Sequence, residues 1–401
     1  MRFNLKLLGI ILPIAGLIWG CIDLYKVDIQ TAKSYLIIEG SITNLPERQF
    51  VSVFRTKSNA VFKSSEFTST IVAQKGSYNP VKAAKVKVVE NGSSTYILTE
   101  ESPGFYVMPS NFLGKLGGTY QLFIEMPDGQ RYTSALETMA KVPPIERVYE
   151  KFNTKGILDR STSIGQIATN DFYVDFTDPV NERNFYRWSS ITYEIQKICA
   201  TCRGGLYFKD IGASGPYGEC REETKLSVNN LFDYACGSLC WDIFYGNSLD
   251  IFSDVYTDGK TQKDKLVAQI PLYQSNPCLV VIRQASLSPN AYRYSKLVQD
   301  QSINTGTLAD TPPAPIKGNL VNDADKAELV LGYFMASMVN ENRYWLDRKN
   351  TSGGQPDGLF FTKNGRSPNL EPPFLYRLSV PTALGSNSES RTTNSPSGWR
   401  F

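Results

Sequence analysis

Cysteine is the residue type whose spacing in this sequence points most directly to chemistry. Apart from Cys21, all the cysteines lie between residues 199 and 278. In an exported chain an even number of cysteines in a short stretch predicts disulfides, here three, that brace a loop-rich region. The alternatives are a mixture of paired and free thiols, or a metal site, because Cys199-Ala-Thr-Cys202 is a C-x-x-C pattern. The disulfide candidates are Cys199, Cys202, Cys220, Cys236, Cys240 and Cys278.

A second group of reactive side chains is acidic. Asp175, Asp178 and Glu182 lie within nine residues. Paired carboxylates hydrolyse glycosides or bind calcium, but both chemistries need a partner acid or further ligands that the sequence does not place. Asp178-Pro179 also favours a turn. We therefore expect a turn here, and we expect no catalytic residue, no metal, no cofactor and no enzyme activity.

Composition narrows the function classes further. Histidine is absent, which excludes Ser-His-Asp and Cys-His nucleophiles and His-ligated zinc. The formal net charge of +3 gives no strong positive field, so we expect no nucleic-acid partner. Aromatic residues make up 12% of the chain, and some of them could stack on sugars, although most should pack in the core. The aromatic candidates in the second half are Tyr186, Trp188, Tyr207, Trp241 and Tyr245.

The N-terminus has the layout of a lipoprotein signal peptide. Arg2 and Lys6 form a basic region, and the uncharged run at residues 7–19 is shorter than the roughly 20 residues of a membrane-spanning helix. Leu17-Ile-Trp-Gly-Cys21 resembles a lipobox, in which a peptidase cuts before the cysteine and the thiol carries a diacylglycerol. We predict a signal peptide at 1–20 and acylated Cys21; the alternative is an ordinary signal peptide with a cysteine nearby by chance.

The mature chain should be tethered to a bilayer by its lipid. Removing Arg2 and Lys6 leaves 40 basic against 39 acidic side chains, a net charge of +1. Acyl chains contribute about 0.8 kcal/mol per buried CH₂, so a multiply acylated cysteine anchors stably. Residues 21–33 mix charged and apolar side chains without a sustained period, as expected for a stalk between the lipid and the fold.

The elements that would position these residues are predicted to be β-strands. Between residues 34 and 141, short apolar or alternating runs are separated by turn signals, and the alternation of Lys85-Val-Lys-Val88 indicates one wet and one buried face. Asp128-Gly129 is a hairpin signal. This pattern predicts an immunoglobulin-like β-sandwich at 34–141.

Val142-Pro-Pro144 is a natural boundary, after which a second β-rich sandwich domain is expected at residues 142–348. Residues 199–278 form its cysteine-rich insertion. One short helix is predicted after Ser288-Pro289, which supply an N-cap and a first-turn proline. Residues 349–401 are rich in Gly, Ser and Pro and form a C-terminal tail. The expected fold class is all-β.

Motifs in a fixed order along the chain carry a family resemblance. They include Pro143-Pro-Ile145, Phe185-Tyr-Arg-Trp188 and Leu331-Gly-Tyr-Phe-Met-Ala-Ser337. The others are at residues 36–44, 80–86, 103–106, 118–120, 127–129, 176–179, 240–241 and 318–320. On these motifs the chain resembles the Bacteroidota outer-membrane lipoproteins called domain of unknown function 4249. Its tail differs, because similar proteins often carry cysteine pairs before a closing aromatic residue, and Trp399-Arg-Phe401 follows none.

The resemblance implies an outer-membrane lipoprotein encoded beside a SusC-like, TonB-dependent receptor, and it transfers no catalytic residue. We therefore expect a non-enzymatic, lipid-anchored accessory protein that partners such a β-barrel transporter in substrate capture or uptake, at the cell surface rather than on the periplasmic face. One alternative is an accessory subunit of an outer-membrane protein assembly or secretion machine. The other is a surface glycan-binding module or hydrolase that uses the Asp175 and Asp178 region and the aromatic residues.

Overall fold

The computed structural model describes residues 34–57, 78–158, 166–209, 218–303, 314–352, 358–371 and 378–401. The predicted signal peptide, Cys21 and the stalk lie outside the described residues. Helices α2 (Pro289–Ile303) and α3 (Leu359–Asn364) are short beside the many strands, which confirms the predicted all-β class. Among the described residues, neither helix is long and apolar enough to cross a membrane.

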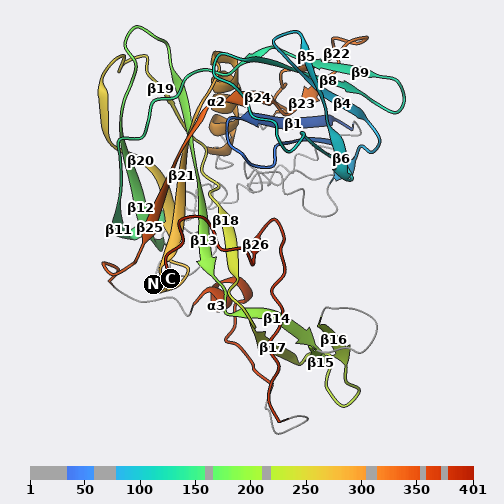
Figure 1. The fold of residues 1–401 in the computed structure, drawn as a ribbon, viewed down its shortest axis with the longest axis vertical. Coiled ribbons are helices and arrows are strands. Elements are labelled where there is room, and N and C mark those ends of the chain that lie inside the picture. The colour runs from blue at the N-terminus through green and yellow to red at the C-terminus, as the bar shows by residue number, and fades with distance from the viewer. Residues whose placement is uncertain are drawn as a thin grey trace, which may run out of the picture.

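The first sandwich consists of two sheets (Figure 1). The first sheet has the order β23-β1-β2-β7-β6, with β24 on β1 and β3 on β2. Its strands are β1 Leu36–Thr43, β2 Phe50–Thr56, β3 Tyr78–Pro80, β6 Thr99–Ser102, β7 Phe105–Val107, β23 Val330–Leu331 and β24 Phe334–Ser337. The second sheet has the order β22-β9-β8-β4-β5, with β10 on β8. Its strands are β4 Lys85–Glu90, β5 Ser94–Ile97, β8 Thr119–Glu125, β9 Arg131–Ser134, β10 Glu137–Thr138 and β22 Leu320–Asn322.

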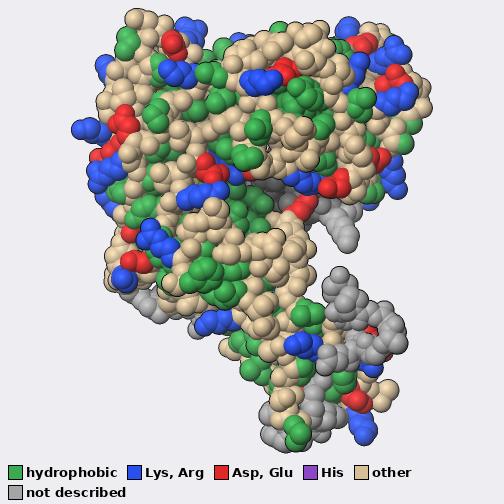
Figure 2. All heavy atoms as spheres, viewed as in Figure 1, with side chains coloured by type: hydrophobic (Ala, Val, Ile, Leu, Met, Phe, Trp, Pro, Cys, Tyr) green, Lys and Arg blue, Asp and Glu red, His purple; other side chains and the backbone are tan. Residues whose placement is uncertain are grey.

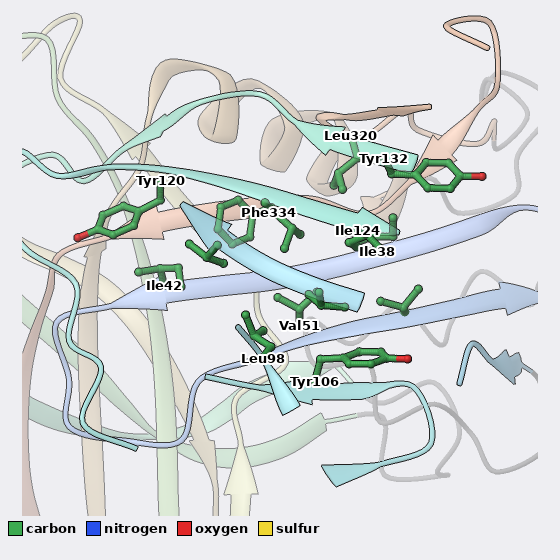
Figure 3. Close-up of a cluster of buried hydrophobic side chains, with 14 of the residues drawn as sticks. Ile38, Ile42, Val51, Leu98, Tyr106, Tyr120, Ile124, Tyr132, Leu320 and Phe334 are labelled. Atoms are coloured by element: carbon green, nitrogen blue, oxygen red, sulfur yellow. The ribbon is translucent and has the colours of Figure 1, made fainter. Parts of the chain in front are cut away.

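Alternating side chains place the core between these two sheets. In β4 the lysines are exposed while Val86 and Val88 are buried, as the alternation predicts. Figure 3 shows Ile38, Val51, Tyr120 and Phe334 among the side chains that meet in this core. The predicted hairpin is present: Gly129 has φ 86°, which an L side chain rarely adopts, and the Met126 amide donates to the Gln130 carbonyl.

The first sandwich is not built from residues 34–141 alone, so the predicted linear division of the chain at residue 141 needs a correction. β23 and β24 run parallel to β1, and β22 pairs with β9. Gly332, with φ 84°, lies so close to β1 that an added Cβ would meet the Ile38 carbonyl oxygen. Residues 320–337, which were assigned to the second domain, therefore complete the first sandwich, because among the described residues β23 and β24 pair with the edge of β1 that β2 leaves open.

The second sandwich also has two sheets. The three-stranded sheet has the order β11-β12-β20, and the six-stranded sheet has the order β25-β21-β13-β18-β26 with β19 on β13. The strands are β11 Arg147–Leu158, β12 Gln166–Thr177, β20 Thr261–Pro271, β13 Phe185–Ile195, β18 Trp241–Tyr245, β19 Asp250–Ser253, β21 Cys278–Ser286, β25 Val339–Leu346 and β26 Arg391–Thr392. Phe172, Phe176, Tyr186 and Trp188 form much of the core between the two sheets.

The two sandwiches are joined by α2 and by hydrogen bonds. The predicted N-cap is present, since the Ser288 hydroxyl accepts from the Ala291 amide. Figure 1 shows α2 between the sandwiches, where its Tyr292 stacks on Phe185 and its Tyr294 packs against Tyr333. Next to the helix, the Ser286 hydroxyl donates to the Ala140 carbonyl. These contacts hold the sandwiches in one arrangement.

Only the first half of the predicted insertion at residues 199–278 forms an arm, which projects from the lower end of the second sandwich (Figure 1). The prediction is wrong for the second half, because residues 241–271 supply strands β18, β19 and β20 of the sandwich itself. The arm contains two hairpin-like pairs, β14 with β17 and β15 with β16. Its strands are β14 Ile198–Arg203, β15 Gly205–Phe208, β16 Glu219–Glu222 and β17 Leu231–Ala235. The C-terminal segment packs beside the arm, where Ala383 joins a small apolar cluster with Tyr207, Phe232 and Tyr234.

Candidate binding cleft between the two sandwiches

Four of the six predicted cysteines form disulfides within the arm. Cys199 is bonded to Cys236, and Cys202 to Cys220, with Cα–Cα distances of 4.8 and 5.4 Å. Each bond crosses between neighbouring segments of the arm and fixes strands that have only a small core of their own.

The expectation of three disulfides is wrong, because Cys240 and Cys278 are free and buried thiols. Cys278 lies on β21 directly opposite Glu194 of β13, inside the body of the sandwich rather than in the arm. Burial raises the pKa of both thiols, so they stay protonated at neutral pH. The mixture of paired and free thiols is the interpretation that the structure supports.

The acidic candidates do not converge on one point. Asp178 is buried and accepts a 2.6 Å hydrogen bond from the Tyr186 hydroxyl. Asp175 lies on β12, accepts from the Asp264 amide and sits 3.8 Å from Arg147, whereas Glu182 is exposed in the following turn. Within the described residues no group of three His, Cys, Asp or Glu side chains is arranged to hold a metal ion.

Four of the five aromatic candidates are buried packing residues: Tyr186, Trp188, Tyr207 and Trp241. Tyr245 differs, because 48% of it is exposed. It belongs to the outer face of the six-stranded sheet, the face turned away from the core of the second sandwich. The candidate binding site therefore lies on this outer face and not at the predicted acidic turn.

The outer face is made of cross-strand rows of apolar and aromatic side chains. Because the register pairs Ile191 with Tyr245 and Tyr193 with Ile243, these four side chains lie together on one side of β13 and β18. In Figure 2 hydrophobic side chains gather on this wall, where the surface is hollowed between the first sandwich and the arm. We call the surface between Glu39 of β1 and Tyr245 of β18 the cleft.

The upper end of the cleft holds two charged side chains that face each other across the sandwiches. Arg187 lies on the outer face of β13, two residues before Ser189. Glu39 lies on β1, next to Gly332. Both are only partly exposed. Within the described part of the chain, neither side chain forms a hydrogen bond, but their opposite charges attract each other.

Burial is the largest cause of the pKa shifts of Glu39 and Arg187 at this end of the cleft. It raises the pKa of Glu39 from 4.5 to about 7, and the positive charge of Arg187 offsets only part of that effect. Burial likewise lowers the pKa of Arg187, against the attraction of Glu39. The nearby Tyr294 of α2 has a raised pKa, because of burial and then the Glu39 charge. The cleft thus presents a guanidinium with unused donors and a carboxyl group that titrates near neutrality.

Between Arg187 and Tyr245, a cluster of paired charged side chains lies along the border of the cleft, which we call the rim. Arg283 of β21 donates to Glu341 at 2.9 Å and to Glu47 at 2.7 Å, and Glu341 also pairs with Arg343 at 2.5 Å. Glu47 belongs to the turn between β1 and β2, so this cluster bridges the two sandwiches. Its donors are already used, which distinguishes Arg283 from Arg187.

The lower end of the outer face is occupied by the C-terminal segment of the chain itself. The Trp399 ring packs edge-on against Trp241 and Trp345, with ring centroids 5.4 and 4.9 Å apart. The Arg343 guanidinium donates to the Ser397 carbonyl at 2.7 Å. The same sheet face therefore accepts an aromatic side chain carried by a chain segment without helical structure.

Sequence reasoning identified Tyr245 as an aromatic candidate but missed Glu39 and Arg187. Arg187 lies within the motif Phe185-Tyr-Arg-Trp188, and Glu39 lies within the motif at residues 36–44, yet neither motif indicates a site residue by itself. The signal that could have found Arg187 is its charge, because the other outer-face residues of the strand, such as Phe185, Ser189 and Ile191, are uncharged.

Comparison with known families gives one match. The family model described as "Domain of unknown function (DUF4249)" matches residues 22–343. No curated protein matches the chain.

Proposed function

The chain belongs to the DUF4249 family, and on that basis we propose that it is a non-enzymatic, lipid-anchored accessory protein of the outer membrane. Its proposed partner is a TonB-dependent, SusC-like β-barrel transporter, which it would assist in substrate capture or uptake at the cell surface. The family description itself names no activity, so the barrel partner follows from the resemblance described above, and the anchor and the binding surface are argued from the residues and geometry of this chain.

The anchor is supported by the lipobox-like sequence that ends in Cys21. A lipid at this position confines the chain to a membrane surface. The absence of histidine and the pairing of two buried acids support a non-enzymatic role: Asp242 pairs with Lys363 and Arg391, and Asp233 with Arg366. Such acids are held in structural ion pairs rather than poised for proton transfer.

The single observation that carries a partner role is the braced arm. It extends away from both sandwiches, and two disulfides and an apolar cluster hold its strands. It also exposes apolar side chains, such as Val228, which is 74% exposed, and Leu370 beside it, which is 54% exposed. A pre-ordered surface binds with a smaller loss of conformational entropy than a free loop does.

Affinity purification of tagged full-length protein from gently solubilised outer membranes tests the proposal. We expect a β-barrel of the TonB-dependent class to co-purify, and Val228→Asp on the arm to lower its yield. Recovery of the protein alone, under conditions in which known transporter pairs survive, contradicts the proposal. Recovery with the barrel-assembly machinery supports the assembly role instead. A matched surface control is Ile97→Asp on the first sandwich, where Ile97 is 72% exposed.

A further inference from the structure

The cleft contains one cation, Arg187, whose guanidinium forms no hydrogen bond with any described residue. Arg187 is held on β13 between the buried Tyr186 and Trp188, so its backbone position is fixed by the core. Among the described residues its guanidinium forms no hydrogen bond and feels only the charge of Glu39, whereas Arg283 and Arg343 are hydrogen-bonded or paired with carboxylates. A planar guanidinium binds a carboxylate through two parallel hydrogen bonds.

The cleft continues from Arg187 along an apolar strip. Residues of one strand that share a face are about 7 Å apart, so Ile191 lies about 13 Å from Arg187 along β13. Ile191 is flanked by Tyr245 of β18, with Tyr193 the next outer-face residue. An extended ligand of about five residues spans the distance from the guanidinium to these rings.

The C-terminal segment shows what kind of ligand this sheet face accepts. Trp399 packs on Trp241 and Trp345, and the Tyr245 hydroxyl donates to the Glu389 carbonyl at 3.3 Å. Both contacts are made to a peptide, one through an aromatic side chain and one through the main chain. Ile191 is buried in this interface, but Tyr245 beside it is 48% exposed, so the open part of the face begins at Tyr245 and is continuous with the interface.

We propose that the cleft binds an extended peptide with a free C-terminus, whose carboxylate pairs with Arg187 and whose aromatic side chain, four residues earlier, packs on Tyr193 and Tyr245. The inference is independent of the barrel partner, because it concerns the isolated chain. Glu39 lies beside the bound carboxylate and disfavours it when ionised.

A pair of synthetic peptides tests this proposal without any mutation. The probe is acetyl-Trp-Ala-Ser-Ala-Ser as the free acid, compared with its C-terminal amide, and binding to the full-length protein in non-ionic detergent is measured by calorimetry. The acid should bind about ten- to a hundredfold more tightly, as expected when a charge-assisted hydrogen bond is lost. Replacing the tryptophan of the probe by alanine should weaken the acid and the amide by the same factor.

Variants of the protein then show which side chain binds the carboxylate of the peptide and which binds its aromatic ring. Arg187→Gln should abolish the preference for the acid, and Arg187→Lys, which keeps the charge but loses the planar fork, should retain part of it. Tyr245→Ala should weaken both peptides equally and leave the preference intact. The matched control is Arg131→Gln, an exposed arginine of β9 on the first sandwich, which should change nothing.

Two results would overturn the proposal. One is equal binding of acid and amide by the wild-type chain. The other is the absence of binding of either peptide at concentrations up to about 1 mM, where even a weak specific site is occupied. Because neither result involves a transporter, the peptide site and the proposed partner role fail or stand separately.

Discussion

At the residue scale, Glu39 makes the stability of the protein depend on pH. Its pKa is about 7 in the folded chain, against an ordinary value of 4.5, because burial penalises the charged form. Between these two values the folded state binds more protons than the unfolded state does, so the free energy of unfolding falls as pH rises through this window. Among the described residues, Arg187 on β13 and Tyr294 on α2 face Glu39. The guanidinium stays charged and the phenol stays neutral between pH 4.5 and 7, so neither adds to this pH dependence.

We expect Glu39→Gln to remove this contribution. Relative to the variant, the wild type should lose about 1–2 kcal/mol of unfolding free energy between pH 5 and pH 8, less than the full pKa shift implies because solvent reaches part of the carboxylate. Urea unfolding of both proteins at several pH values measures the difference, in which other titrating groups cancel. Parallel stability curves for the two proteins would contradict a raised pKa.

The pair of Glu194 and Arg348 is fully buried and joins β13 to the start of the tail. The two side chains are 2.5 Å apart, and Arg348 also donates to the Gln274 and Asn276 carbonyls. Arg348→Met leaves the Glu194 carboxylate without its cation in a site whose burial already raises its pKa. We expect a loss of about 3–5 kcal/mol in denaturant unfolding.

The matched control for this change is the next residue, Lys349, whose side chain is 85% exposed. Lys349→Met removes only a surface ion pair with Asp347, and its effect should stay below about 1 kcal/mol. The double variant Glu194→Gln with Arg348→Met should recover part of the loss, since no uncompensated charge remains. Equal midpoints for Arg348→Met and the wild type would show that the pair is not needed for stability.

At the element scale, alternation and turn signals were sufficient for the strands whose partners are close in sequence. The hairpin at Asp128-Gly129, the alternating strand β4 and the capped helix after Ser288 are all present. These signals are local, because side-chain period, left-handed turns and N-caps depend on a few neighbouring residues.

The pairings between elements that are distant in sequence were not predicted. β24 pairs in parallel with β1, and β26 pairs with β18, although nothing in their own residues specifies these partners. The cleft has the same origin: Glu39 and Arg187 meet only because α2 and the late strands bring the sandwiches together. Free Cys278 was assigned to a disulfide for a related reason, since its spacing gives no sign that it belongs to the buried face of β21.

The arm provides a prediction about its thiols. Alkylation of the native protein should label none of the cysteines, and alkylation after unfolding without reductant should label two, Cys240 and Cys278. Only reduction should expose Cys199, Cys202, Cys220 and Cys236. Mass spectrometry of the Cys21→Ala variant gives the count without interference from the lipidation site. Complete protection after unfolding would indicate a third disulfide.

The same disulfides should stabilise the arm locally. A disulfide typically contributes about 2–4 kcal/mol, and the arm has a small core to compensate for its loss. Cys202→Ser with Cys220→Ser should therefore increase hydrogen exchange in β15 and β16 but leave the strands of the first sandwich protected. Uniformly faster exchange in both regions would mean that the arm and body unfold together.

At the scale of the whole molecule, the predicted lipid anchor on Cys21 should determine where the protein acts. Cys21→Ala should move the protein from the membrane fraction to the soluble fraction, and intact mass of the wild type should show acyl chains on the N-terminal cysteine. Fractionation after cell lysis measures the first effect. Wild-type protein that is soluble and unmodified would contradict the lipoprotein prediction.

The anchor and the arm should act together in partner binding. A mature net charge near +1 gives no long-range attraction, so recognition depends on local contacts and on the time the two proteins spend near each other. Confinement to one membrane raises the effective concentration of the partner without any new contact. We therefore expect Cys21→Ala to reduce crosslinking to the barrel in intact cells by more than about tenfold, within the range that tethering provides.

The purified variant should still bind the detergent-solubilised barrel with wild-type affinity, and Val228→Asp on the arm should weaken both interactions. A Cys21→Ala variant that binds the purified barrel poorly would show that the N-terminus forms part of the interface rather than a tether.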